Sequence, residues 1–388
     1  MLSRLFSYLS HYFPRHLAPQ LRELYMTISI LNLAMAAIMI FEPIYLLGLG
    51  YQLSGVIGFY LAVYIIYFLI MPLGAKMALR FGYNKSIIFS TLFLISYYLS
   101  LWGLESSPIF LLTAIPAFAL QKTFYWPGYH SEFARYGEAR EEAREVSSRE
   151  VIDMVGSVLG PFFGGLILYF SNFSTLFIIV CLLVLISNLP LLMTPEVFTP
   201  GKFFYFDAYR RLFDRENRRL VFSFLGYGEE FIVLVLWPIY MYAFVGSFLS
   251  LGSLVAVTTL LTATIILYVG RLTDHTNKRN VLKSGSILYA LIWGIRPYIA
   301  SLTGIFLVDA LSRLSKKILA IPQMAIVYER GRQSHHIMRN SVMFEMSLVM
   351  GKILAMFAII IVFYFWPLNA WSLIFVVAAF FTLLYLLL

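Results

Sequence analysis

The sequence predicts an all-α integral membrane protein with twelve transmembrane helices, arranged as two pseudo-repeated six-helix bundles. Three observations carry this prediction. The chain is 60% hydrophobic and only 13% charged, whereas an average soluble domain has roughly 25% charged residues. Its apolar stretches are about 20 residues long, the length that a helix needs to cross a bilayer. The second half of the chain also resembles the first at a fixed offset of 195 residues.

The internal repeat consists of short matches that share this one ungapped offset. Pro43-Ile44-Tyr45 recurs as Pro238-Ile239-Tyr240. Further matches join Pro127 to Pro322, Glu150 and Gly156 to Glu345 and Gly351, and Tyr169-Phe170 to Tyr364-Phe365. A hydrophobic chain built from two parallel repeats is typical of transporters whose site lies between the halves.

The apolar stretches fall into two groups of six around a polar segment. They are residues 24–48, 55–79, 86–104, 108–128, 151–170, 174–193, 220–245, 249–269, 281–301, 303–327, 341–365 and 367–388. Their length and the short connections favour helices over the alternating strands of a barrel. The predicted organisation is an interfacial cytoplasmic segment (1–23), an N-terminal bundle (24–193), a cytoplasmic linker with a short surface helix (194–219) and a C-terminal bundle (220–388).

The net charge of +9 has a one-sided distribution. Most of the Lys and Arg residues lie in alternate loops, and the intervening loops carry none. The positive-inside rule therefore predicts a multi-pass protein of the cytoplasmic membrane with both termini in the cytoplasm. The basic excess indicates contact with anionic lipid headgroups rather than with nucleic acid.

A loop motif follows the eighth predicted span. The chain reads Gly270-Arg-Leu-Thr-Asp274-His-Thr-Asn-Lys278-Arg279. This segment resembles the loop motif of the major facilitator superfamily, which has a glycine, an acidic residue four positions later and a basic pair. The resemblance extends over essentially the whole chain, through the twelve spans and the halves of six. It implies the major facilitator fold and secondary transport by alternating access.

The equivalent loop of the first half is degenerate, because only Arg80, Gly82 and Lys85 match the motif there. In the superfamily this loop latches the closed cytoplasmic gate across the two halves. The resemblance therefore implies a gating role for Gly270, Asp274, Lys278, Arg279 and Arg80, with Asp274 facing Arg149 at the start of span five. The alternative is an ordinary cytoplasmic turn.

The fifth predicted span carries small residues around a proline. They are Gly156, Gly160, Pro161, Gly164 and Gly165. This pattern resembles span five in the drug–proton antiporter branch of the superfamily. The alternative is close packing between helices, which small residues allow in any membrane protein.

Charged residues inside the spans are costly, at roughly 2.5–3.5 kcal/mol each at mid-bilayer on insertion scales, and they usually face a partner or a cavity. Those away from the cytoplasmic span ends are Glu42, Lys122, Glu229, Glu230, Arg296, Asp309, Arg313, Lys316, Lys317, Glu345 and Lys352. The resemblance implies that spans one, four, seven and ten line a central cavity, and most of these residues lie on those spans.

The predicted substrate cavity comprises the charges of spans four, seven and ten and one aromatic residue: Lys122, Trp126, Glu229, Glu230, Asp309, Arg313 and Lys317. Glu229 and Glu230 are the predicted proton carriers, because adjacent carboxylates in a low dielectric disfavour joint ionisation. Internal ion pairs without a ligand are the alternative, and they are the preferred interpretation for Glu345 and Lys352.

The predicted function is therefore secondary transport of a small solute by a monomer. Protons are the expected coupling ion, and another ion is the alternative. The pattern in span five favours export of amphiphilic compounds, whereas the cationic residues of spans four and ten favour an anionic solute. Two other classes stay open: a sensor or scaffold that keeps the fold without transport, and a lipid-handling protein of the flippase kind. No phosphate loop, metal-ligand spacing or catalytic nucleophile stands out, so no enzyme activity, cofactor or metal is expected.

Overall fold

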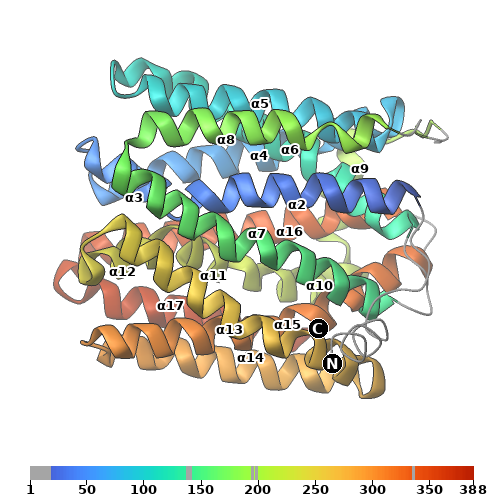
Figure 1. Cartoon of the computed structure of the whole chain (residues 1–388). Helices are drawn as coiled ribbons and strands as arrows, with labels where there is room; N and C mark the ends of the chain where they lie inside the picture. The colour runs from blue at the N-terminus through green and yellow to red at the C-terminus, as the bar shows by residue number, and fades with distance from the viewer. Residues whose placement is uncertain (1–18, 137–141, 194–195, 197–199, 334–336) are drawn as a thin grey trace, which may run out of the picture.

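The computed structural model describes residues 19–136, 142–193, 196, 200–333 and 337–388, and within them the regular elements are helices lying roughly alongside one another (Figure 1). The first half contains α2 (Pro19–Met39), α3 (Glu42–Gly48), α4 (Leu53–Phe81), α5 (Tyr83–Gly103), α6 (Leu111–Tyr136), α7 (Glu142–Phe170) and α8 (Phe173–Ser187). The linker contains α9 (Tyr205–Phe213). The second half contains α10 (Arg218–Phe224), α11 (Gly228–Phe231), α12 (Trp237–Val245), α13 (Phe248–His275), α14 (Lys278–Ile295), α15 (Leu302–Gln333), α16 (Ile337–Phe365) and α17 (Ala370–Leu384).

The repeat in the sequence reappears in the helix bounds. Helix α7 begins at Glu142 and ends at Phe170, and α16 begins at Ile337 and ends at Phe365, so both bounds differ by the same 195 residues. Helices α4 and α13 begin at Leu53 and Phe248 with the same offset. Local sequence thus sets equivalent helices in the two halves, and the fold class predicted from the sequence is confirmed.

Nine helical segments of the described residues are long and apolar enough to cross a membrane, and Phe248–Ala263 of α13 is a shorter apolar stretch. Helix α15 is not among the nine, although it spans 32 residues. It carries Asp309, Arg313, Lys316 and Lys317 between its ends, so its neighbours must supply partners for these charges.

Two predicted spans are interrupted at equivalent prolines. The first span was expected to be one helix over 24–48, but α2 ends at Met39 and α3 begins at Glu42, because Pro43 has no N–H to donate to the Met39 carbonyl. The seventh span has a π-helical turn at Ile232–Leu236 just before Pro238, the repeat equivalent of Pro43. Interruptions of this kind turn side chains away from a regular helical stripe and are frequent at functional sites.

The two halves meet mainly where α7 packs on α13 and where α16 packs on α4 and α6, and we call this contact region the seam. In Figure 1, α7 crosses between α2 and α13, and α16 runs beside the first-half helices. Glycines allow this approach. A Cβ at Gly252 of α13 would lie 2.1 Å from the carbonyl oxygen of Pro161 on α7.

The linker helix α9 is anchored to α4 by two tyrosines. Pro72 inside α4 leaves the Phe68 carbonyl without its helical donor. The Tyr209 hydroxyl donates to the carbonyls of Phe68 and Leu69, at 3.2 and 2.8 Å, and the Tyr205 hydroxyl also donates to Leu69. Burial, together with the Tyr205 hydroxyl, raises the pKa of Tyr209, so this side chain stays a neutral donor at physiological pH.

The end of the bundle where α4 and α13 finish is called the basic end below. The linker helix with Arg210 and Arg211 and the start of α14 with Lys278 and Arg279 lie there. The C-terminus lies there too, because Arg219 at the start of α10 donates to the Leu387 carbonyl at 2.7 Å. Of the predicted interfacial segment 1–23, residues 1–18 lie outside the described residues, and α2 begins at Pro19, earlier than expected.

Candidate functional site

A histidine and a glutamate from opposite halves form a buried pair at the seam. His130 Nε2 on α6 lies 2.9 Å from Glu345 Oε1 on α16, and both side chains are almost fully buried. The other ring nitrogen of His130 lies 3.0 Å from the Tyr328 hydroxyl of α15. Tyr67 of α4 donates to Glu345 Oε2 at 2.8 Å. These four residues, two from each half, are called the histidine cluster.

A second group lies at the seam nearer the middle of the helices, and it centres on the ring of Tyr64 on α4. Lys122 Nζ of α6 and Lys352 Nζ of α16 lie 5.5 and 5.3 Å from the centre of this ring. Lys352 also forms an ion pair with Glu230 of α11, with Nζ 2.6 Å from Oε2. Lys122, Tyr64, Lys352 and Glu230 are called the lysine cluster.

Helical periodicity connects the two clusters on α6. Phe118, Lys122, Trp126 and His130 are each four residues apart, so they lie along one face of the helix. The Trp126 indole stacks on the His130 imidazole, with ring centres 5.5 Å apart and an interplanar angle of 22°. On α16, Glu345 and Lys352 are seven residues apart and also share a face. The same two helices therefore contribute to both clusters.

Glu229 points away from the seam into the second half, although it is adjacent to Glu230. It is fully buried, and Lys316 of α15 forms an ion pair with its Oε1. The Tyr289 hydroxyl donates to Oε2 at 2.8 Å, and the Tyr385 hydroxyl lies 3.3 Å from Oε1. The structure thus separates the two predicted proton carriers, with Glu230 in the lysine cluster and Glu229 in a network inside the second half.

The charges of α15 are held in the second half as well. Arg313 Nε donates to Asp309 Oδ2 at 2.7 Å, one helical turn away. The same carboxylate accepts from Thr258 of α13 at 2.6 Å and from the Trp237 indole of α12 at 2.8 Å. The sequence placed Asp309 and Arg313 in the substrate cavity, and the structure holds them in this network. Lys317 is half-buried on the same helix, next to Lys316.

Two further charges of the spans lie outside both clusters. Arg296 is buried, with its guanidinium carbon 3.4 and 3.9 Å from the ring centres of Trp293 and Trp237 and one hydrogen bond to Ser312. Glu42 of the first half accepts hydrogen bonds from the Tyr60 and Tyr97 hydroxyls, each at 2.5 Å.

The loop motif occupies helix ends rather than a loop. Gly270 and Asp274 lie in the last turns of α13, which continues to His275. Asn277 then caps α14 by accepting from the Arg279 backbone N–H. Lys278 forms an ion pair with Glu329 of α15 at 3.0 Å, within the second half.

The remaining gating residues are only partly described. The guanidinium of Arg80 lies 5.2 Å from the ring centre of Phe81 on the same helix. The side chains of Asp274 and Arg149, which the sequence pairs across the seam, lie outside the described residues.

The glycines of the fifth span pack against two different helices. Cβ atoms built at Gly156, Gly160 and Gly164 would lie within 3 Å of atoms of α2, the shortest approach being 1.9 Å, from Gly164 to the Ala37 carbonyl oxygen. A Cβ at Gly165 would lie 2.6 Å from the Phe248 carbonyl oxygen of α13. Pro161 lies within α7, which continues to Phe170. This span thus joins the first half to the second.

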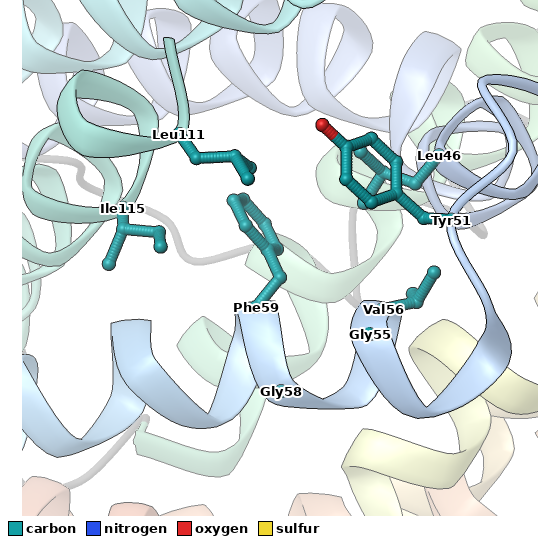
Figure 2. Close-up of a pocket in the computed structure, with 8 residues that line it drawn as sticks. All are labelled: Leu46, Tyr51, Gly55, Val56, Gly58, Phe59, Leu111 and Ile115. Atoms are coloured by element: carbon teal, nitrogen blue, oxygen red, sulfur yellow. The ribbon is translucent and has the colours of Figure 1, made fainter. Parts of the chain in front are cut away.

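An apolar hollow of about 180 Å³ lies in the first half, at the end opposite the basic end. Figure 2 shows Phe59, Tyr51 and Leu111 around it, with Gly55 and Gly58 on the α4 backbone. Its lining residues include no charged side chain. The hollow is therefore separate from both clusters.

Sequence reasoning missed His130, Tyr64, Tyr67, Tyr328 and the pairing of Lys316. A signal for His130 was present, because it continues the four-residue spacing of Lys122 and Trp126 toward the basic end. The tyrosines gave no such signal in a chain with 26 of them.

Two repeated helical halves with buried polar groups between them form an architecture that membrane transporters share. Residues 15–211, just over half of the chain, match the family described as Major Facilitator Superfamily. The chain belongs to this superfamily and is a transporter rather than an enzyme. No curated protein matches the sequence.

Solved transporters share the fold at low sequence identity. The human organic anion transporter MFSD10 (TETRAN) is 15% identical over 96% of this chain and 100% of that chain, with a TM-score of 0.64. The major facilitator transporter FucP in the outward conformation is 13% identical over 95% and 98%, with a TM-score of 0.68. A structure of the E. coli fucose:proton symporter FucP is 14% identical over 95% and 98%, with a TM-score of 0.67.

Proposed function

We propose that this protein is a proton-coupled secondary transporter, in which the His130–Glu345 pair is the protonatable link between the halves. The observation that carries the proposal is the position of this pair: it is buried, it joins α6 to α16, and it lies between the lysine cluster and the basic end. Opening a path toward the basic end between these two helices requires the pair to separate.

The chemistry of the pair makes its strength depend on protons. An imidazolium and a carboxylate attract each other strongly in a low dielectric. Neutralising either partner removes that attraction and leaves a hydrogen bond. Histidine is the side chain suited to such a change near neutral pH. The other groups facing the pair are Tyr67, Tyr328 and, on the surrounding helices, Tyr227 and Lys352.

The sequence-based candidates Glu230 and Glu229 remain in this proposal as alternative carriers. Glu230 belongs to the lysine cluster at the seam, so its protonation would release Lys352. Glu229 is enclosed within the second half. We further propose that the basic end faces the cytoplasm, and that the solute is exported, as the pattern in span five favours. FucP, described as a fucose:proton symporter, gives a precedent for proton coupling in this fold.

The proposal is tested with spin labels on Phe81→Cys of α4 and Asn280→Cys of α14, in a Cys181→Ala background. Distances between the labels are measured at pH 6 and pH 8. We expect the wild-type pair to shift its distance distribution between the two values, and His130→Gln and Glu345→Gln to abolish the shift. A shift that persists in both variants but disappears in Glu230→Gln or Glu229→Gln would assign the proton to those residues instead.

Transport itself is measured in proteoliposomes as uptake of ethidium, an amphiphilic cation, and of benzoate under an imposed pH gradient. Uptake of either compound that exceeds uptake by protein-free liposomes and stops when the gradient is collapsed supports proton coupling. A protein that changes its label distances with pH but moves neither compound, with or without a gradient, would favour the sensor alternative.

A further inference from the structure

Resting on the transport function proposed above, we infer that the solute is an organic anion and that Lys122 and Lys352 bind its acidic group at the seam. The two cations come from opposite halves and share the ring of Tyr64. An anion held by both would contact both halves, which is what a transported solute must do at the centre of an alternating-access protein.

Lys122 is the first reason for this inference. Its ammonium lies 4.1 Å from the centre of the Phe118 ring and 5.5 Å from that of Tyr64. No carboxylate among the described residues lies within ion-pair distance of it, and Glu42 of the same half accepts from two tyrosines instead. A lysine near the middle of a span is costly, and aromatic faces compensate only part of that cost. An anionic ligand would supply the missing charge.

The ion pairs that Arg313, Lys316 and Lys352 form indicate why the anion would bind beside Lys122 and Lys352. Arg313 is paired with Asp309, and Lys316 with Glu229, inside the second half. Lys352 is paired with Glu230, whose side chain keeps 30% of its surface accessible although it lies in mid-span. Glu230 is therefore a counter-ion that an incoming anion could replace.

The chemical class of the ligand follows from the surrounding groups. The aromatic rings of Tyr64 and Phe118 lie beside the Lys122 ammonium. An acidic group on an apolar or aromatic body fits this combination of ammonium groups and rings. Both a free carboxylate or phosphate monoester and an anionic lipid headgroup have this chemistry, so the test separates these sources.

The test measures equilibrium binding by thermal stabilisation of the full chain in nanodiscs of neutral phosphatidylcholine. The probes are benzoate and phenyl phosphate, with benzamide and benzylamine as neutral and cationic analogues of the same size. Dioleoylphosphatidylglycerol is added to a parallel set of nanodiscs. The variants are Lys122→Gln, Lys352→Gln and Glu230→Gln, and Lys283→Gln is the matched control because it removes one exposed positive charge far from the seam.

We expect stabilisation by an anion but not by benzamide or benzylamine. Lys122→Gln and Lys352→Gln should each weaken binding about tenfold or more, since a charge-assisted contact is lost, and Lys283→Gln should leave it unchanged. Glu230→Gln should strengthen binding, because it removes the competitor for Lys352. A merely structural role for Glu230 would not produce this gain.

Phosphatidylglycerol that stabilises the wild-type protein in a Lys122-dependent manner, with no effect of benzoate or phenyl phosphate, identifies the anion as a lipid headgroup. Equal binding in Lys122→Gln and wild type, benzamide binding as well as benzoate, or no stabilisation by any anion would overturn the inference. Binding requires neither a gradient nor transport. Anion binding without uptake would therefore contradict only the proposed function, and uptake of ethidium without anion binding would contradict only the inference.

Discussion

The Trp126 indole lies between the two clusters, stacked on His130 at 5.5 Å and one helical turn from Lys122. It also packs edge-on against Tyr129, at 5.6 Å between ring centres. A ligand that moves Lys122 or its aromatic surroundings would therefore press on the imidazole that pairs with Glu345. Trp126 is the physical connection between solute and proton in the proposed mechanism.

Trp126→Leu should separate the two functions. The leucine keeps an apolar side chain on α6 but loses the stacked ring, so we expect anion binding within about threefold of wild type, because Lys122 keeps its place. Addition of benzoate should shift the distance between labels on α4 and α14 in the wild type and no longer do so in Trp126→Leu. Trp102→Leu, which removes a tryptophan of α5 that is 40% exposed, is the control. An unaltered benzoate response in Trp126→Leu would contradict the connection.

The His130–Glu345 pair should show strong energetic coupling. Removing one member of a buried pair costs roughly 3–5 kcal/mol, because the other is left without its partner. We expect His130→Gln and Glu345→Gln each to lower the free energy of unfolding, and the double variant to cost less than the two single losses added together. The measurement is denaturant unfolding of the four proteins. Additive losses would show that the pair does not interact as the geometry indicates.

Lys316 and Glu229 should matter far more for stability than Lys278 and Glu329. In the first pair Glu229 is fully buried and Lys316 is 21% exposed, whereas Lys278 and Glu329 are 30% and 47% exposed. Lys316→Met is expected to cost about 3 kcal/mol, and Lys278→Met no more than about 1 kcal/mol. Thermal unfolding of both variants checks the contrast. Similar losses in both would mean that the Glu229 carboxylate finds another partner.

Gly164→Ala should destabilise the bundle, because the added Cβ would lie 1.9 Å from the Ala37 carbonyl oxygen and would push α7 away from α2. Overpacking of this kind costs about 1–3 kcal/mol. Gly58→Ala is the matched control in α4, since a Cβ there meets nothing within 4 Å. It should be neutral or stabilise by about 0.5–1 kcal/mol. The comparison is a thermal unfolding midpoint for each variant in the same lipid.

Tyr209 should contribute more to stability when Pro72 is present than when it is replaced. The Tyr209→Phe change removes the donor to the Phe68 carbonyl and is expected to cost about 1 kcal/mol. In a Pro72→Ala background, the restored backbone N–H can supply that carbonyl, so the same change should cost less. A double-mutant cycle by chemical unfolding measures the difference. Equal costs in both backgrounds would contradict the proposed role of the tyrosine.

The fold could be predicted from the sequence because its signals are local or periodic. Hydropathy marks the spans, and the repeat offset of 195 gives the two halves. The break at Pro43 could also have been anticipated, since a proline cannot donate to the preceding turn. The structure placed this break within the predicted span without changing the number of spans in the fold.

The site could be predicted only in part, because pairing depends on how each helix is rotated. Glu229 and Glu230 are neighbours in sequence, yet one faces Lys316 inside the second half and the other faces Lys352 at the seam. Lys316 and Lys317 are likewise neighbours in sequence, and the rotation of α15 turns Lys316 toward Glu229. The sequence favoured a structural ion pair for Glu345. Its partner in the structure is His130, which lies in the other half. Contacts between residues 215 positions apart have no local signal.

The charges of α15 also constrain how the protein is made. The ion-pair partners of Asp309, Arg313 and Lys316 lie on α15 itself or on α11, which precedes it in the chain. Thr258 and Trp237, which donate to Asp309, also precede α15, whereas Tyr385, a neutral partner of Lys316, follows it. As the ribosome delivers this segment, the earlier helices are already synthesised and can receive it, so its charges need not cross the lipid uncompensated. A fusion of α15 alone to a reporter should therefore leave α15 outside the bilayer. A fusion that begins at α10 and includes α15 should insert α15 into the bilayer.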